Sequence, residues 1–248
     1  MLISVITVCF NSESTIRDTV SSVARQSLDA FEHIIIDGNS TDSTVILINS
    51  ERHARLKLVS EPDEGIYWAM NKGLEVATGE YVAFLNADDF YKDDNVLLRV
   101  ADVARKTGSD LILGNTEFLN SYRPRRFNRL YSAKYFRRWW IKLGIMPPHP
   151  SLFARRTLLN KAGGFDTSYK ICADFDLIAR LILQHNASWA SLNHTTTVFR
   201  EGGLSTSGEH VRKEISLEFA RSLKSIGILG ARWRVMLRYP FKALQYLH

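Results

Sequence analysis

Apolar runs of strand length alternate with amphipathic segments of helix length through the first half of this 248-residue chain. The runs are rich in Ile, Val and Phe, and the segments between them carry apolar residues at helical spacing. The pattern predicts strands at 3–9, 31–37, 56–60, 80–85 and 110–113, and helices at 14–26, 42–50, 65–76 and 94–106. Strand–helix–strand repeats at this spacing predict an α/β domain whose mainly parallel sheet is flanked by helices.

The residues that directly follow the predicted strands are polar or acidic. Asn11, Asp37, the segment 61–63 and the segment 86–89 each follow one strand. Ligands of parallel α/β sheets bind outside the carboxyl ends of the strands. We therefore expect these side chains to meet at one edge of the sheet and to form a ligand site there.

Two adjacent carboxylates, Asp88 and Asp89, follow the strand predicted at 80–85. Paired like charges at a strand end are costly unless a cation neutralises them. A hard divalent cation such as Mg²⁺ or Mn²⁺ prefers oxygen ligands, and it keeps water and substrate phosphates as its other ligands. For this motif alone, a solvated turn in which Asp88 caps a helix is the competing interpretation.

A second acidic strand end is formed by Asp37 and Gly38. A carboxylate at this place can accept hydrogen bonds from a base or a ribose, and a glycine permits close approach of a ligand. Ser40 and Asp42 are candidates for the cap of the next helix. A third polar segment, at 61–73, is expected beside the same edge of the sheet.

Six groups of residues follow one another in a specific order along the chain. They are Ile3-Ser4-Val5-Ile6-Thr7-Val8-x-x-Asn11; Ile36-Asp37-Gly38-x-Ser40-x-Asp42-x-Thr44; Asp63-x-Gly65 with Ala69-x-Asn71-x-Gly73; Gly79-Glu80-Tyr81; Leu85-Asn86-Ala87-Asp88-Asp89; and Gly163-Gly164-Phe165-Asp166 with Ala173-Asp174-Phe175-Asp176-Leu177. Over residues 2–205 this ordered set resembles the family 2 glycosyltransferases. With His149-Pro150-Ser151 ahead of Gly163, it is most similar to bacterial exopolysaccharide enzymes of the colanic-acid type.

The resemblance implies a GT-A fold, which is a Rossmann-like, mainly parallel sheet flanked by helices. It implies an inverting, metal-dependent transfer of a hexosyl or deoxyhexosyl group, with Mn²⁺ or Mg²⁺ as cofactor and a UDP- or GDP-sugar as donor. Thr7, Asn11 and Asp37 would line the nucleoside site. The residues expected to bind the nucleotide sugar are, in full, Thr7, Asn11, Asp37, Asp63, Asn71, Asn86 and Asp88.

The expected metal site departs from the family pattern at one position. Asn86 stands where the family often has the first acid of its D-x-D motif, and Asp88 stands at the second. Asp88 is therefore the expected chief metal ligand, and Asp89 is expected to support it. An amide supplies no negative charge, so we expect weaker metal binding than a full acidic pair provides.

The catalytic base of the family matches Asp174, although Ala173 stands where a glutamate usually precedes it. A carboxylate within hydrogen-bond reach can take the proton of an acceptor hydroxyl, while a metal stabilises the departing diphosphate. The competing interpretation of Asp174 is a cap for the helix expected near 173–184. The resemblance brings His149 near the acceptor or the diphosphate, and a purely structural role is the alternative.

The net charge of +6 comes from two basic stretches. The segment 122–142 mixes arginines and lysines with Tyr, Phe and the pair Trp139-Trp140, and the tail 233–247 has a similar composition. Such stretches bind an anionic membrane surface, form an ordinary solvated surface, or bind nucleic acid. Because a lipid-diphosphate-linked saccharide is the expected acceptor, we favour the membrane and expect no nucleic acid. The protein is expected in the cytoplasm, at the inner face of the cell membrane.

The chain is predicted to form a transferase domain over 1–205 and a basic, mostly helical extension over 206–248. Within the domain, 1–115 would bind the nucleotide and 116–205 the acceptor. No signal peptide and no transmembrane helix are expected. Two other functions remain open: a nucleotidyltransferase, and a catalytically degenerate scaffold at the membrane. The expected role is sugar transfer in bacterial surface or exopolysaccharide assembly.

Overall fold

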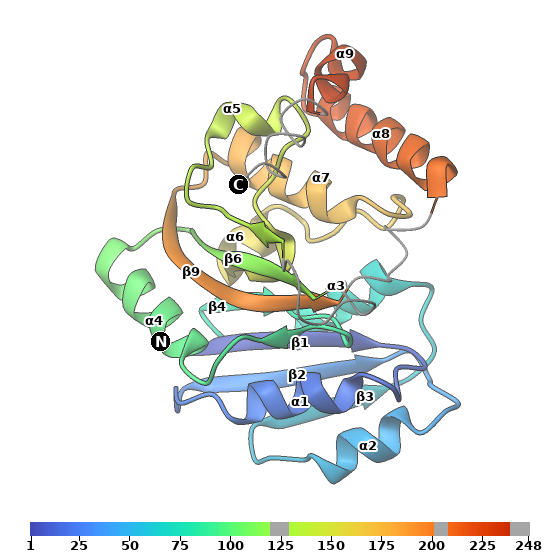
Figure 1. The fold of residues 1–248 in the computed structure, drawn as a ribbon, viewed down its shortest axis with the longest axis vertical. Helices are drawn as coiled ribbons and strands as arrows, with labels where there is room; N and C mark the ends of the chain where they lie inside the picture. Colours follow the sequence, from blue (N-terminus) through green and yellow to red (C-terminus); the bar gives the residue numbers. More distant parts are fainter. Residues whose placement is uncertain (120–128, 201–207, 239–248) are drawn as a thin grey trace.

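The computed structural model describes residues 1–119, 129–200 and 208–238. Its described part is built on a nine-stranded sheet with the order β3-β2-β1-β4-β8-β6-β9-β5, and β7 pairs with β6. The strands are β1 (Ile3–Cys9), β2 (Phe31–Asp37), β3 (Leu56–Ser60), β4 (Tyr81–Phe84), β5 (Phe90–Tyr91), β6 (Leu111–Leu119), β7 (Leu130–Tyr131), β8 (Leu152–Arg155) and β9 (Trp189–Arg200). Figure 1 shows β9 as a strongly curved strand.

The helices cover both faces of the sheet. They are α1 (Ile16–Ala24), α2 (Thr44–Ser50), α3 (Ile66–Val76), α4 (Val96–Thr107), α5 (Arg138–Ile141), α6 (Arg156–Lys161), α7 (Ala173–Ala179), α8 (Gly208–Ser225) and α9 (Ala231–Met236). A π-helical turn, Arg180–Gln184, continues α7, so the helix expected near 173–184 is present. The elements predicted for the first half are also present with closely similar ends, except that β6 is longer than expected.

The sheet is parallel in its first half and mixed in its second. β1 pairs in parallel with β2 and β4, and β2 pairs in parallel with β3, as the alternation of strands and helices predicts. β8 is antiparallel to both β4 and β6, whereas β9 is parallel to β6. The antiparallel part was not predicted, because β5, β7 and β8 are short and β9 mixes polar and apolar residues.

Burial of β1 and β2 on both faces explains why apolar residues dominate both strands, and their few polar side chains are buried as well. Ile6 and Val8 of β1 lie in one core with α3 and α7. Ile3 and Val5, on the opposite face, lie in another core with α4. A strand covered by helices on both sides has no solvent-facing positions that polar residues could occupy.

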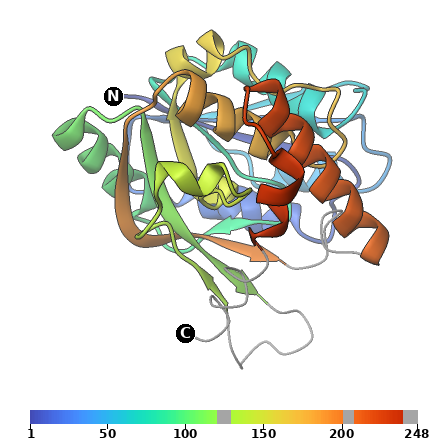
Figure 2. The same ribbon diagram turned by 90° about the horizontal axis from the view of Figure 1, so that it is seen from above.

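The C-terminal helices α8 and α9 pack on the rest of the protein. The ring of Phe219 on α8 stacks on that of Phe175 on α7, with centroids 3.9 Å apart. Ala231 and Val235 of α9 lie in the same core as α7. Figures 1 and 2 show α8 and α4 at opposite sides of the molecule. α8 ends at Ser225 and α9 begins at Ala231, and the end of the predicted helical extension, 239–248, lies outside the described residues.

Two further observations bear on sequence-based expectations. Cys9 and Cys172 are free and buried. None of the described helices combines the length and the apolar character that passage through a lipid bilayer requires.

Candidate active site

The ends of the parallel strands lie side by side, as the sequence predicts. Cys9 at the end of β1 is level with Asp37 at the end of β2, and Asp37 is level with Ser60 at the end of β3. The arrowheads of β1 and β2 point to the same side in Figure 1. The segments that follow these strands, together with the residues after β4, therefore meet at one edge of the sheet.

Asp37 organises the loop that follows β2. It is fully buried, and its carboxylate accepts hydrogen bonds from the Ser40 hydroxyl at 2.5 Å and from the Ser60 hydroxyl at 2.6 Å. The side-chain amide oxygen of Asn11 accepts from the backbone N–H of Thr41 at 2.9 Å. The loops after β1 and β2 are thus joined into a single unit at this edge.

Asp63, Gly38 and Phe10 lie together beside this unit. The Asp63 carboxylate accepts from the backbone N–H of Gly65 at 2.9 Å. A Cβ atom added to Gly38 would lie 2.9 Å from Asp63 Oδ2 and 3.5 Å from the ring of Phe10, so a larger residue here would displace the Asp63 carboxylate. The Phe10 side chain is 61% exposed at the strand end, where its ring offers a flat apolar surface.

The structure corrects the expectation for Thr7. Its side chain is fully buried, and its hydroxyl lies 3.0 Å from Nε2 of His33 within the layer between sheet and helices. Thr7 is level with Ile35, two residues before the strand ends. A group that is buried at this level does not reach a ligand at the edge, so we leave Thr7 out of the candidate site.

The segment after β4 gathers acidic groups in a partly dry environment. Burial raises the pKa of Asp88, although the nearby Arg200 guanidinium lowers it. Asp89 is fully buried, and burial and the neighbouring Asp88 charge raise its pKa well above the ordinary value. Asp89 accepts one hydrogen bond from the backbone N–H of Arg200 at 3.3 Å. The two carboxylates therefore lie where a positive charge would be stabilised.

A divalent cation fits the donor atoms present here. Asn86 Oδ1 and Asp89 Oδ2 are buried and have no hydrogen-bond partner among the described residues. An amide oxygen and a carboxylate oxygen that are buried without hydrogen-bond partners are hard ligands of the kind that Mg²⁺ and Mn²⁺ prefer. Within the described ranges, His, Cys, Asp and Glu nowhere form a group of three that could hold a metal. Donor phosphates and water would have to complete the coordination, as is usual for Mg²⁺.

Asp174 lies at the start of α7 and is partly exposed. Burial raises the pKa of its carboxyl group to about 6, against the opposing effect of the Phe175 backbone N–H, which donates to Oδ1 at 2.7 Å. Glu218 on α8 raises the pKa further. A carboxylate with this pKa is ionised at neutral pH and is still basic enough to accept a proton.

An aromatic cluster connects the end of β4 to the segment before Asp174. The ring of Phe165 lies 4.9 Å from that of Phe84 and 5.7 Å from that of Tyr67, measured between centroids. Tyr67 in turn donates a hydrogen bond to the backbone carbonyl of Ile171. These contacts connect the segment before Asp174 to Phe84, which ends β4 two residues before Asn86.

His149 belongs to this aromatic cluster. Its ring stacks on Phe84 at 5.9 Å between centroids and contacts Phe165 edge-on. Burial lowers the pKa of His149 to about 4, so the ring is neutral at pH 7. A neutral ring brings no positive charge to a diphosphate. Of the two interpretations open from the sequence, the structural one therefore agrees better with these contacts.

Asn71 has a structural role that its sequence position did not reveal. Its side-chain amide donates to the carbonyl of Phe165 and accepts from the N–H of Phe165, both at 2.9 Å. A Cβ atom on Gly164 would lie 2.6 Å from Asn71 Oδ1, and Gly164 has φ of +67°. Asn71 therefore fixes the backbone of the aromatic cluster, and both polar ends of its side chain are already occupied.

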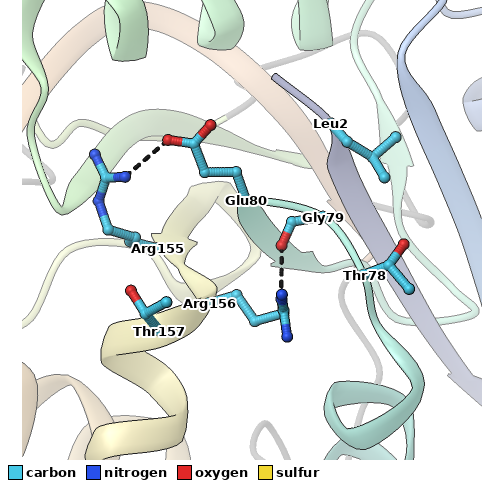
Figure 3. Close-up of a pocket in the computed structure, with 7 residues that line it drawn as sticks. All are labelled: Leu2, Thr78, Gly79, Glu80, Arg155, Arg156 and Thr157. Atoms are coloured by element: carbon cyan, nitrogen blue, oxygen red, sulfur yellow. Dashed lines mark hydrogen bonds and ion pairs between the residues drawn. The ribbon is translucent and has the colours of Figure 1, made fainter.

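A cavity of about 320 Å³ lies at the opposite end of the strands. Figure 3 shows its lining, in which Arg155 pairs with Glu80 and Arg156 donates to the carbonyl of Gly79. Leu2 and Glu80 precede β1 and β4, whereas the acidic segment follows β4. This cavity is therefore remote from the candidate site.

Comparison with known proteins decides the family. The model of glycosyl transferase family 2 matches residues 4–160, which is more than half of the chain. The chain belongs to glycosyl transferase family 2. The resemblance to the family 2 glycosyltransferases is thereby confirmed, and the similarity to enzymes of the colanic-acid type stays a prediction.

Curated relatives and solved structures of glycosyltransferases agree with this assignment. A PGL/p-HBAD biosynthesis glycosyltransferase of Mycobacterium bovis is 28% identical over 94% of this chain and 91% of its own length. An uncharacterized glycosyltransferase of Mycobacterium tuberculosis is 31% identical over 73% of this chain and 69% of its own.

The fold is shared with two enzymes solved with nucleotide sugars. S. aureus TarS in complex with UDP-GlcNAc has a TM-score of 0.72 and 22% identity, over 90% of this chain and 66% of that chain. The mannosyltransferase PcManGT from Pyrobaculum calidifontis, with GDP-Man and Mn²⁺, has a TM-score of 0.63 and 16% identity, over 98% of this chain and 79% of its own. These neighbours confirm the expected GT-A fold.

Three residues near the candidate site were not singled out from the sequence: Phe10, Arg200 and Glu218. Arg200 ends β9, donates to the backbone carbonyl of Asp88 and forms an ion pair with Asp18. The signal available for Phe10 was its place at a strand end, beside Asn11. No local pattern marks Arg200 or Glu218, because their partners lie far away in the sequence.

Proposed function

We propose that this glycosyltransferase moves one sugar from a UDP- or GDP-sugar to an acceptor hydroxyl with inversion, and that Asp174 is the general base. The observation that carries the proposal is the partly exposed Asp174 carboxylate, whose pKa burial raises to about 6. General bases work best with a pKa close to the working pH. At pH 7 this group is ionised and ready to accept a proton.

The reaction is a single displacement. Asp174 takes the proton from the acceptor hydroxyl as its oxygen forms a bond to the anomeric carbon. The bond from that carbon to the nucleoside diphosphate breaks on the opposite face, and the diphosphate leaves with the electron pair. One displacement at one carbon inverts its configuration, so a single base is sufficient.

We assign the donor to the edge formed by the loops after β1, β2 and β4. Asn11, Asp37 and Asp63 would surround the nucleoside, and Phe10 would stack on the base. Asp88, supported by Asp89 and Asn86, would hold Mn²⁺ or Mg²⁺, which when bound neutralises charge on the departing diphosphate. Asp37 acts here mainly by fixing the loop through Ser40 and Ser60.

We further propose that the acceptor is a lipid-diphosphate-linked saccharide in bacterial surface or exopolysaccharide assembly. The supporting observation is an apolar and basic surface, here called the α9 surface: Leu229, Arg232, Trp233, Arg234 and Met236, all exposed. Tryptophan and leucine side chains enter the headgroup region, and arginines attract anionic lipid. This surface suits peripheral binding to the inner face of the cell membrane. Of the basic stretch 122–142, residues 122–128 lie outside the described part.

A thermal-shift screen against UDP-, GDP- and TDP-sugars with Mn²⁺ tests the donor assignment. A bound donor stabilises the folded state by about 2.7 kcal/mol at a hundredfold excess over its Kd. We expect one nucleotide class to raise the Tm of the wild type and to leave Asp88→Ala unaffected. If no donor stabilises the wild type, the degenerate scaffold becomes the better interpretation. If the turnover product is pyrophosphate, the protein is instead a nucleotidyltransferase.

A further inference from the structure

Glu218 on α8 holds the backbone that leads into Asp174. Its carboxylate accepts three hydrogen bonds from consecutive backbone N–H groups: Lys170 at 2.8 Å, Ile171 at 3.1 Å and Cys172 at 2.8 Å. The side chain is 8% exposed. A buried carboxylate is tolerated where hydrogen bonds replace its water, and three N–H donors satisfy this requirement.

The same short segment is held from a second side. Tyr67 on α3 donates to the carbonyl of Ile171. The N–H and the carbonyl of Ile171 are therefore both hydrogen-bonded to side chains of other helices. Phe219, the neighbour of Glu218, stacks on Phe175 immediately after Asp174. The chain around the start of α7 is therefore held by α3 and α8, and Asp174 lies between the held backbone of 170–172 and the ring of Phe175.

The charge of Glu218 acts on Asp174 as well. The other titratable groups around Asp174 are Tyr67 on α3, Tyr131 on β7 and Cys172 before α7. Burial raises the pKa of Tyr131 to about 12, and it also raises the pKa of Tyr67 and of Cys172. All three groups therefore stay neutral at physiological pH. Arg238 acts on Cys172. Among the described groups that act on Asp174, Glu218 is thus the charged one.

We propose that Glu218 is a positioning residue for Asp174 and that it supplies, from the C-terminal extension, the carboxylate that Ala173 does not. The inference rests on the proposed role of Asp174 and goes beyond it, because it makes α8 part of the active site. Through the three backbone contacts, Glu218 fixes where the base stands relative to the acceptor. Through its negative charge, Glu218 favours protonation of the Asp174 carboxylate, which makes Asp174 a stronger base.

The variant Glu218→Gln tests both effects in the full chain with Mn²⁺. Glutamine keeps the length of the side chain, but it loses the charge and one of the two accepting oxygens. Because small displacements of a reacting group cost up to about a hundredfold in rate, we expect kcat to fall at least about tenfold with the donor KM unchanged. We also expect the acid limb of the pH–kcat profile to move to lower pH, since loss of a neighbouring negative charge lowers the pKa of Asp174.

Two further variants serve as controls. Glu214 lies one turn earlier on α8, is partly exposed and pairs with Lys170 at 4.0 Å. Glu214→Gln removes a carboxylate from the same helix without touching the backbone of 170–172, so kcat and the acid limb should stay as in the wild type. Glu218→Asp keeps the charge, so it should retain the wild-type acid limb even where kcat falls, and it replaces Glu218→Gln if that variant does not fold.

A direct titration of Asp174 separates this inference from the proposed function. The Asp174 carboxyl signal, followed by carbon NMR with Asp174→Asn for its assignment, should titrate at lower pH in Glu218→Gln than in the wild type. An unchanged titration together with an unchanged kcat overturns the role of Glu218 and leaves sugar transfer intact. If the wild type transfers no sugar, the proposed function is overturned. A titration of Asp174 that still shifts in Glu218→Gln would then support only the effect of Glu218 on the Asp174 carboxyl group.

Discussion

The Tyr67 hydroxyl donates a hydrogen bond to the backbone carbonyl of Ile171, and this bond joins the nucleotide side of the site to the base side. Tyr67 lies in the first turn of α3, which follows the carboxyl end of β3, and Ile171 lies three residues before Asp174. The Tyr67 ring also stacks on Phe165. The segment that leads into α7 and Asp174 is thereby fixed to the start of α3, beside the loops that follow the parallel strands.

Asp174 should cost the protein stability at neutral pH. Its pKa in the folded state, about 6, lies above the ordinary 3.8. The carboxyl group therefore contributes stability that is fully present below about pH 4 and is lost as the pH rises through about 6. Relative to the wild type, we expect Asp174→Asn to gain on the order of 2–3 kcal/mol in unfolding free energy between pH 4 and pH 8. Urea denaturation at the two pH values measures this gain.

Asp166 provides a control of opposite sign for that experiment. Burial acts to raise its pKa, but the hydrogen bonds from Ser168 outweigh burial and hold the pKa below the ordinary value. Ionisation of Asp166 thus favours folding, and Asp166→Asn should lose stability relative to the wild type between pH 3 and pH 8. If Asp174→Asn shows the same sign as Asp166→Asn, the raised pKa of Asp174 is incorrect.

Asn71 is expected to matter for stability more than for donor binding. Asn71→Ala leaves the N–H and the carbonyl of Phe165 without their partners, and each unsatisfied buried group costs about 1–3 kcal/mol. The Tm should therefore fall, while the donor KM measured below the transition should change little. Gly164→Ala should have a similar effect, because its Cβ atom would collide with Asn71. A large rise in KM without loss of Tm would instead support direct contact with the nucleotide sugar.

Metal binding should respond in opposite directions to two substitutions. Asn86→Asp restores an acidic pair and should tighten Mn²⁺ binding, because affinity rises with the number of charged ligands. Asp88→Asn should weaken Mn²⁺ binding by more than about tenfold, because even the loss of a residue that only hydrogen-bonds a metal ligand costs about that much. Calorimetric titration of Mn²⁺ in the presence of nucleoside diphosphate measures both without turnover. Equal affinities in all three proteins would exclude this segment as the metal site.

The α9 surface should bind anionic vesicles. Arg232→Gln and Arg234→Gln should each weaken binding about fivefold, since a basic residue near the membrane contributes about 1 kcal/mol. Trp233→Ser should weaken it further by removing an inserted side chain, and high salt should release the wild type. Leu98→Ser, on α4 at the opposite side of the molecule, is the matched control. Co-sedimentation in which all of these proteins bind alike, or none binds, would contradict the membrane role.

Much of the fold could be predicted because β1, β2 and β4 are buried along their whole length and are mostly apolar. Ile3–Cys9 and Phe31–Asp37 are mostly apolar and are followed within two residues by polar or glycine residues, so their bounds agree with the sequence pattern. β8 and β9 escaped prediction for a physical reason. β8 is a run of only three apolar residues and an arginine that follows a proline-rich segment, and β9 mixes Asn, His and Thr with apolar residues, so neither stands out locally from a loop.

The candidate site was predictable only where chemistry and position coincide in a short motif. Asp88, Asp89 and Asp174 stand in such motifs, whereas the contacts of Glu218 join residues more than 45 positions apart. Thr7 and Asn71 show the reverse case. Both stand in recognisable motifs, yet the fold occupies their polar atoms with His33 and Phe165. Side-chain direction depends on tertiary packing, which a motif does not specify.

The transfer rate of Asp174→Asn under single-turnover conditions tests the central claim most directly. Asparagine keeps the shape of the side chain but cannot accept the proton, so the rate should fall about 10²–10⁴-fold, the usual contribution of a general base. Donor binding, followed by thermal shift, should remain. In the wild type the rate should fall as the pH drops below about 6. An Asp174→Asn protein that transfers sugar at the wild-type rate would contradict the account.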